Sequence, residues 1–132
     1  MSAANALLQA IHRRLSRDAA LTAILGPEGI GDRLMPRADL PCIVFGDLET
    51  RDFSTSTEDG EEHFLTLEIW SDGEGRRQAQ QIAAIAHGLL HNAALDIEGF
   101  SLVSLLQTSQ RARREPKTKL YVCQMRFRAV TE

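Results

Sequence analysis

Apolar side chains recur at helical spacing in the first part of the chain. One side of a helix predicted over residues 3–15 carries four of them: Leu7, Leu8, Ile11 and Leu15. Asp18 can cap a second, short helix whose inward side would carry three more: Leu21, Ile24 and Leu25. Gly26 followed by Pro27 supplies a helix stop.

Strand patterns follow. Residues 30–35 are a weak candidate, whereas residues 42–49 form a short apolar run typical of a buried strand. Over residues 61–70 the side chains are expected to point alternately to the two faces of a strand. The face expected toward the helices carries Leu65, Leu67 and Ile69, and the opposite face carries Phe64, Thr66, Glu68 and Trp70. The polar stretch 51–60 is predicted to be a loop between these two strands.

A third helix is the best defined of the chain. Ser71 and Glu74 form an S-x-x-E capping box, which predicts that the helix starts there. Its apolar stripe consists of Ala79, Ile82, Ala83, Ala86, Leu89 and Leu90. Asn92 can end it.

Two further strands, over residues 100–109 and 120–130, are predicted to close the chain. The segment 110–119 between them contains Pro116, which suits the first corner of a turn. In the last strand the inward set is Tyr121, Cys123, Met125, Phe127 and Ala129, and the outward set is Val122, Gln124, Arg126 and Arg128.

The predicted order is therefore α-α-β-β-β-α-β-β. We expect an α+β fold in which the helices pack on one face of a mainly antiparallel sheet of four to five strands. A chain of 132 residues corresponds to a single domain, over residues 1–132.

Composition narrows the function. With 43% hydrophobic and 25% charged residues the chain is of ordinary globular type, and its net charge of −3 argues against a protein that coats nucleic acid. A secretory signal and a membrane-spanning helix are not expected, because no suitable apolar run is present. Cys42 and Cys123 could form at most one disulfide, and buried free thiols in a reducing cytoplasm are the favoured interpretation.

Candidate catalytic and metal-binding chemistry is weak. His87 and His91 have the spacing at which two imidazoles can share a metal ion, but Gly88 stands where an H-E-x-x-H protease needs glutamate. His63 lies beside acidic residues that could do acid–base work if burial separated their pKa values, but a hydrophilic loop end favours solvation. We therefore predict no enzyme activity, no catalytic residue, no cofactor and no metal.

Charge placement is the remaining signal. Acidic residues gather around the 51–60 loop: Glu49, Asp52, Glu58, Asp59, Glu61 and Glu62. Basic residues gather near the last turn: Arg111, Arg113, Arg114, Lys117 and Lys119. They are either two solvated hairpin tips or the two halves of a head-to-tail contact between copies, which can close into a ring. Likewise, Arg126 and Arg128 either form a solvated face or line the channel of such a ring and meet DNA phosphates.

Four segments carry a resemblance to a known family. They are ALLQAIHRRLSRDAALTAILG, LPCIVFGDLE with the Ser/Thr/Asp loop, EEHFLTLEIWSDGEGRRQAQQIAAIAHGLL, and the closing strand that ends RFRAVTE. In order, spacing and combined length they resemble the tail terminator, or tail-completion, proteins of long-tailed bacteriophages and gene transfer agents. No single segment is diagnostic. The resemblance covers almost the whole chain and is equally compatible with a phage and a gene transfer agent.

The resemblance implies a structural α+β subunit that assembles into a ring, usually a hexamer. Such a ring sits on the head-proximal end of the tail tube, stops tube polymerisation and offers the docking surface for the head connector, while double-stranded DNA passes through its centre. The family brings no enzyme activity or cofactor. It also implies assembly in the bacterial cytoplasm and a final place in the virion, at the head–tail interface.

Two alternatives stay open. A head–tail connector or stopper subunit would bind the portal-side ring instead of the tube end. A soluble ligand-binding or enzymatic α+β domain would be a monomer or dimer whose melting transition is raised by its ligand.

Overall fold

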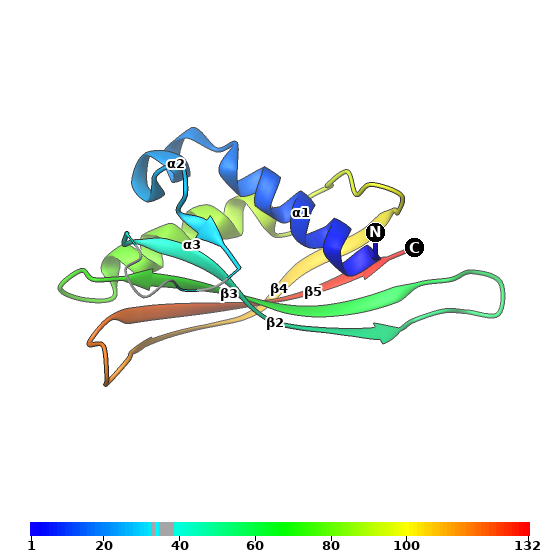
Figure 1. The fold of residues 1–132 in the computed structure, drawn as a ribbon. Coiled ribbons are helices and arrows are strands. Elements are labelled where there is room, and N and C mark those ends of the chain that lie inside the picture. Colours follow the sequence, from blue (N-terminus) through cyan, green and yellow to red (C-terminus); the bar gives the residue numbers. More distant parts are fainter. Residues whose placement is uncertain (33, 35–38) are drawn as a thin grey trace.

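A computed structural model describes residues 1–32, 34 and 39–132. Within this part of the chain, three helices lie on one face of a five-stranded sheet (Figure 1). The helices are α1 (Ala3–Ser16), α2 (Ala19–Leu25) and α3 (Arg77–Leu90). The strands are β1 (Ile30–Gly31), β2 (Cys42–Asp52), β3 (Glu61–Ser71), β4 (Leu102–Arg114) and β5 (Tyr121–Thr131). The predicted fold class and element order are confirmed.

The strand order in the sheet is β1-β2-β3-β5-β4, and all neighbours are antiparallel except β1 and β2. Only Ile30 and Gly31 of the predicted strand 30–35 pair with β2. Asp32 and Leu34 lie outside any strand, and positions 33 and 35 fall outside the described residues. The sheet is therefore mixed, with one short parallel pair at its edge.

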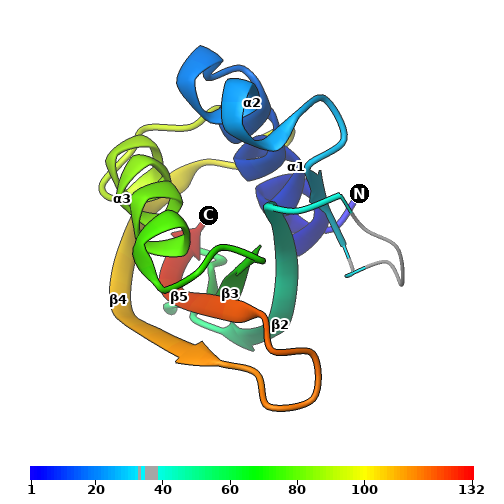
Figure 2. The ribbon, with the colours of Figure 1, turned by 90° about the vertical axis from the view of Figure 1, so that its left-hand side faces the viewer.

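The core lies between the helices and the sheet (Figure 2). The inward sets predicted on β3 and β5 are buried, apart from Tyr121, which is half-buried. Both cysteines are buried and free, as predicted. Two predictions are wrong: Ile24 is 38% exposed, and Val122 is fully buried. Leu21 and Leu25 define the buried side of α2, and Ile24 lies about 100° around the helix from Leu25.

Two strands are longer than their patterns indicate. β2 continues to Asp52 and β4 continues to Arg114, so residues predicted to be loop are strand. None of these added residues is buried, and the strands are extended by backbone pairing to β3 and β5. The loops themselves are shorter: Phe53 N donates to Gly60 O at 2.9 Å, and Glu115 N donates to Leu120 O at 2.7 Å.

The predicted start of α3 is also wrong. Ser71 is the last residue of β3, and its Oγ accepts from Gly73 N at 3.1 Å and donates to Gln78 Oε1 at 2.5 Å. Its hydroxyl is therefore used in the turn before the helix, and α3 begins at Arg77 without a side-chain cap. At the other end the helix stops one residue before the predicted Asn92, because His91 has an extended backbone with ψ 121°, and Asn92 follows it in a left-handed conformation with φ 58°.

Candidate functional site

The acidic residues gather at one end of the sheet, on the hairpin of β2 and β3. Asp52 ends β2, Glu58 and Asp59 lie in the connecting loop, and Glu61 and Glu62 begin β3. The two strands project beyond the helices at this end (Figure 1). We call this hairpin end, residues 52–62, the acidic arm.

Hydrogen bonds within the loop order the tip of the acidic arm. Ser54 Oγ donates to Asp52 Oδ1 at 2.7 Å. Hydrogen bonding by Ser54 lowers the pKa of the Asp52 carboxyl. Thr55 N donates to Glu58 O at 2.8 Å, and Glu58 N donates to Thr55 Oγ1 at 3.1 Å. The loop therefore has a defined shape and presents the exposed carboxylates of Glu58 and Asp59.

The basic residues gather on the hairpin of β4 and β5. Arg111, Arg113 and Arg114 lie on β4 itself and not in the loop, which corrects the predicted position, and Lys117 lies in the turn. Arg113 Nη1 lies 2.9 Å from Glu115 Oε2, and this guanidinium lowers the pKa of the Glu115 carboxyl. We call this hairpin end, residues 111–119, the basic hairpin.

Strand register places the two charged hairpins at opposite ends of the sheet. Asp52 is opposite Glu61, which in turn is opposite Thr131 at the end of β5. Arg114 is opposite Tyr121 at the start of β5. One subunit therefore carries an acidic end and a basic end that point in opposite directions (Figure 1).

Arg126 and Arg128 both lie on the face of β5 away from the helices. Arg128 Nε donates to Glu62 Oε2 at 2.6 Å, and its guanidinium carbon lies 5.5 Å from the centre of the Phe53 ring. Arg126 is exposed and, within the described residues, forms no ion pair. The two arginines are therefore not equivalent, because only Arg126 presents an uncompensated charge.

His87 and His91 attach the end of α3 to β4. Their rings stack with centroids 4.6 Å apart. Gln107 N donates to His91 Nδ1 at 3.0 Å, and His87 Nδ1 lies 2.6 Å from Gln107 Oε1. Asn92 N donates to Leu105 O at 2.7 Å, so the residues after α3 cover part of the outer edge of β4.

His63 is fully buried between two hydroxyl groups. Its Nδ1 lies 2.9 Å from Thr50 Oγ1, and its Nε2 lies 2.9 Å from Thr131 Oγ1. Burial lowers the pKa of this imidazole, and the nearby Glu61 carboxylate partly offsets the effect. The side chain joins β2, β3 and β5 at the base of the acidic arm. The sequence pattern placed His63 with the acidic loop and did not indicate this burial.

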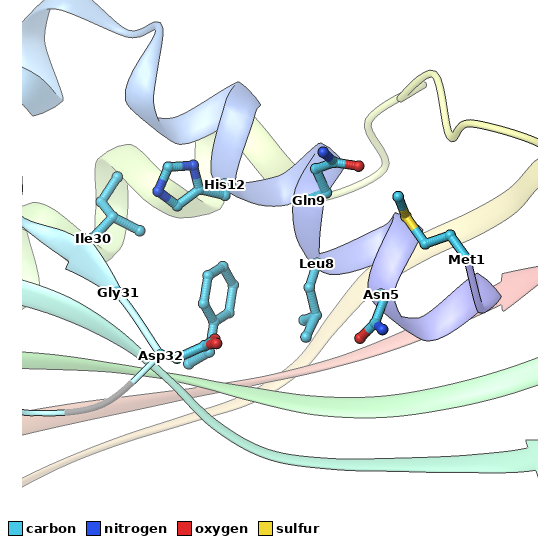
Figure 3. Close-up of a pocket in the computed structure, with 9 residues that line it drawn as sticks. Met1, Asn5, Leu8, Gln9, His12, Ile30, Gly31 and Asp32 are labelled. Carbon is cyan, nitrogen blue, oxygen red and sulfur yellow. The ribbon is translucent and has the colours of Figure 1, made fainter.

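A groove of about 500 Å³ runs between α1 and the β1–β2 edge (Figure 3). Leu8, Ile30 and Phe45 line it with apolar surface, and the titratable side chains among its described lining residues are those of His12 and Asp32. Across the described ranges, no group of three or more His, Cys, Asp or Glu residues is placed to hold a metal ion. No helix in the described part of the chain is long and apolar enough to cross a membrane.

Comparison with known proteins gives a match to a sequence family and matches to solved structures. The sequence model of a family described as "Tail completion protein gp17" matches residues 9–132. A chain from the virion of a native gene transfer agent particle has a similar structure, with a TM-score of 0.88 and 28% sequence identity, over 99% of this chain and 98% of that chain. No curated protein matches.

Proposed function

This chain belongs to the tail completion protein gp17 family, and we propose that within this structural role it acts as a tail terminator. Copies of the subunit form a ring, taken to be a hexamer, on the head-proximal end of the tail tube. The ring stops tube polymerisation by occupying the end without offering a further site for tube protein. The action is stoichiometric and involves no catalytic step.

The proposed ring is supported by one observation: the acidic arm and the basic hairpin lie at opposite ends of the sheet. Glu58 and Asp59 lie at one end of the sheet, and Arg111, Arg114 and Lys117 lie toward the other. Two unlike surfaces on one subunit suit a head-to-tail contact, which closes into a ring when the rotation between copies allows it. Charges at the rim of such a contact mainly guide encounter and register.

The other partners follow from the same proposal. One face of the ring docks onto the tail tube protein, and the other receives the head connector or stopper protein. Double-stranded DNA passes through the centre without sequence-specific contacts, since phosphates alone can be met by arginine. Assembly takes place in the bacterial cytoplasm, and the finished ring remains in the virion at the head–tail interface.

Negative-stain imaging tests this proposal directly. The purified protein is examined alone and mixed with the tail tube protein of the same particle. We expect six-fold rings, or tubes that are capped and limited in length by the added protein. Tubes that grow to the same length with and without the protein, together with particles that never close, would contradict it.

A further inference from the structure

A basic cleft lies between the end of α1 and the segment that follows α3. Its volume is about 510 Å³. Three arginines line it, Arg13, Arg14 and Arg17, and they face His91, Asn92 and Asp96 on the other side. Small residues, Gly88, Ala93 and Ala94, form part of the wall, and they leave the cleft open to a side chain from outside.

The positive charge of this cleft is not neutralised within the described residues. No carboxylate lies within ion-pair distance of the three guanidinium groups, although Asp96 lines the same cleft. Arg13 and Arg17 are one helical turn apart, and Arg17 N donates to Arg13 O at 3.2 Å. Like charges at this spacing oppose each other by about 0.2–0.5 kcal/mol. An anion between them would remove this repulsion.

Stabilisation of a helix end explains only one of the three arginines. Arg14 Nε donates to Leu89 O at 3.2 Å, which satisfies a carbonyl near the end of α3 and ties α1 to α3. Arg13 and Arg17 make no side-chain hydrogen bond in the described part of the chain. Their donors are therefore available for a partner.

We propose that this cleft binds a carboxylate-bearing peptide segment of another tail protein. A guanidinium group binds a carboxylate through two parallel hydrogen bonds, and two such groups in one cleft select an acidic segment. The cleft belongs to the helix layer, whereas the acidic arm and the basic hairpin project from the ends of the sheet (Figure 1). In the ring, on which this proposal rests, the cleft is therefore separate from the contacts between copies.

The concave shape favours a peptide over DNA. Extended side chains of aspartate or glutamate can enter a cleft of about 510 Å³, whereas the backbone of a DNA duplex needs cations that protrude from the surface. The acidic partner would thus be held by Arg13 and Arg17, with Asn92 as an additional hydrogen-bond donor.

Titration with hexaglutamate tests the proposal, with a short DNA duplex as the competing ligand. The variant is Arg13→Gln with Arg17→Gln. The matched control is Arg76→Gln with Arg77→Gln, which removes two exposed charges at the start of α3 and changes the net charge equally. We expect the cleft variant to weaken hexaglutamate binding at least about tenfold and the control to leave it nearly unchanged.

Other results overturn the proposal. Equal binding by the cleft variant and the control would mean that hexaglutamate binds by net charge alone. Cleft-dependent binding of the duplex but not of hexaglutamate would assign the site to nucleic acid. Absence of any binding would leave the arginines as helix-end groups. Ring formation is imaged for the same variants, and rings that persist in the cleft variant separate a failure of this site from a failure of the ring.

Discussion

Arg128 on β5 forms an ion pair with Glu62 on β3, with Nη2 at 2.5 Å from Oε2. The carboxylate side chain is 15% exposed and the guanidinium side chain 32% exposed, so the pair is partly shielded from water. The sequence leaves Glu62 either on a solvated hairpin tip or in a contact between copies, and Arg128 either on a solvated face or in a DNA channel. The two side chains neutralise each other's charge within one subunit, and their ion pair links β3 to β5 at the base of the acidic arm.

The first prediction separates the two arginines of β5. Arg126→Gln should weaken binding of non-specific duplex DNA to the ring and reduce its salt dependence, because an exposed phosphate-contacting charge is lost. Arg128→Gln should leave the salt dependence nearly unchanged but lower the free energy of unfolding by about 1–2 kcal/mol, because Glu62 loses its partner. DNA binding as a function of salt and urea unfolding measure both effects.

The second prediction concerns the contact between copies. Reversing charge on the acidic arm with Glu58→Arg and Asp59→Arg, or on the basic hairpin with Arg111→Glu and Arg114→Glu, should each weaken self-association about tenfold or more. Arg113 is left unchanged because it pairs with Glu115. An equimolar mixture of the two variants should assemble again, since every contact in an alternating ring is then complementary. Sedimentation velocity and imaging distinguish these states.

Circular dichroism of each variant provides the control for this experiment, since both sets of side chains are exposed and the fold should persist. Rings formed equally well by either variant alone, or a mixture that fails to recover, would contradict the head-to-tail contact.

The third prediction is a pH dependence that arises from His63. The pKa of its imidazole is lowered in the folded protein, so the unfolded chain binds more protons between that lowered value and the ordinary value of about 6.5. Stability is therefore complete above about pH 6.5 and falls as the pH decreases toward the folded-state pKa. His63→Gln should flatten this decline while keeping a donor and an acceptor between Thr50 and Thr131.

Urea unfolding at a series of pH values from about 7.5 to 5.5 measures this slope. His12→Gln is the control, because His12 is exposed on α1. A decline of the same size in the His63 variant would mean that other groups cause it.

The fourth prediction concerns the attachment of α3 to β4. His91→Ala removes the acceptor of the Gln107 N–H and should lower the free energy of unfolding by about 0.5–1.5 kcal/mol. Hydrogen exchange at the Gln107 amide should become faster, because the end of α3 opens locally. In His12→Ala, by comparison, the free energy of unfolding should not fall and the Gln107 amide should not exchange faster. Equal exchange rates in the His91 variant and the parent would show that the contact is not maintained in solution.

The elements that pack under the helices could be predicted from the sequence. β3 and β5 each have one face in the core, so Leu65, Leu67 and Met125 fall into an alternating pattern. The outer parts of β2 and β4 could not, because residues such as Thr50 and Arg111 pair through the backbone with little burial. Local polarity resembles a loop there, while the hydrogen-bond partner lies far away in the sequence.

The candidate sites likewise could be predicted where they are local in the sequence and not where they depend on tertiary packing. Clusters of charge along the sequence indicated the acidic arm and the basic hairpin, because each hairpin is local. Their opposite directions depend on the pairing of β3 with β5, which no local pattern encodes. The basic cleft joins Arg13 and Arg17 to residues after α3, and only the packing of α1 on α3 brings these segments together. The predicted helix start at Ser71 was wrong for a related reason, since its hydroxyl forms hydrogen bonds in a turn and does not cap a helix.

The opposed ends of the sheet also give the subunit a direction, and a closed circle of directed subunits has a sense of rotation. Viewed from its two sides, such a circle runs clockwise from one and anticlockwise from the other, so the two sides can never be interchanged. A particle built on it therefore distinguishes head from tail at this joint through geometry alone. In the proposed ring, no unpaired end would remain once the last acidic arm meets the first basic hairpin, and the number of subunits would be set by the angle between copies and not by their supply.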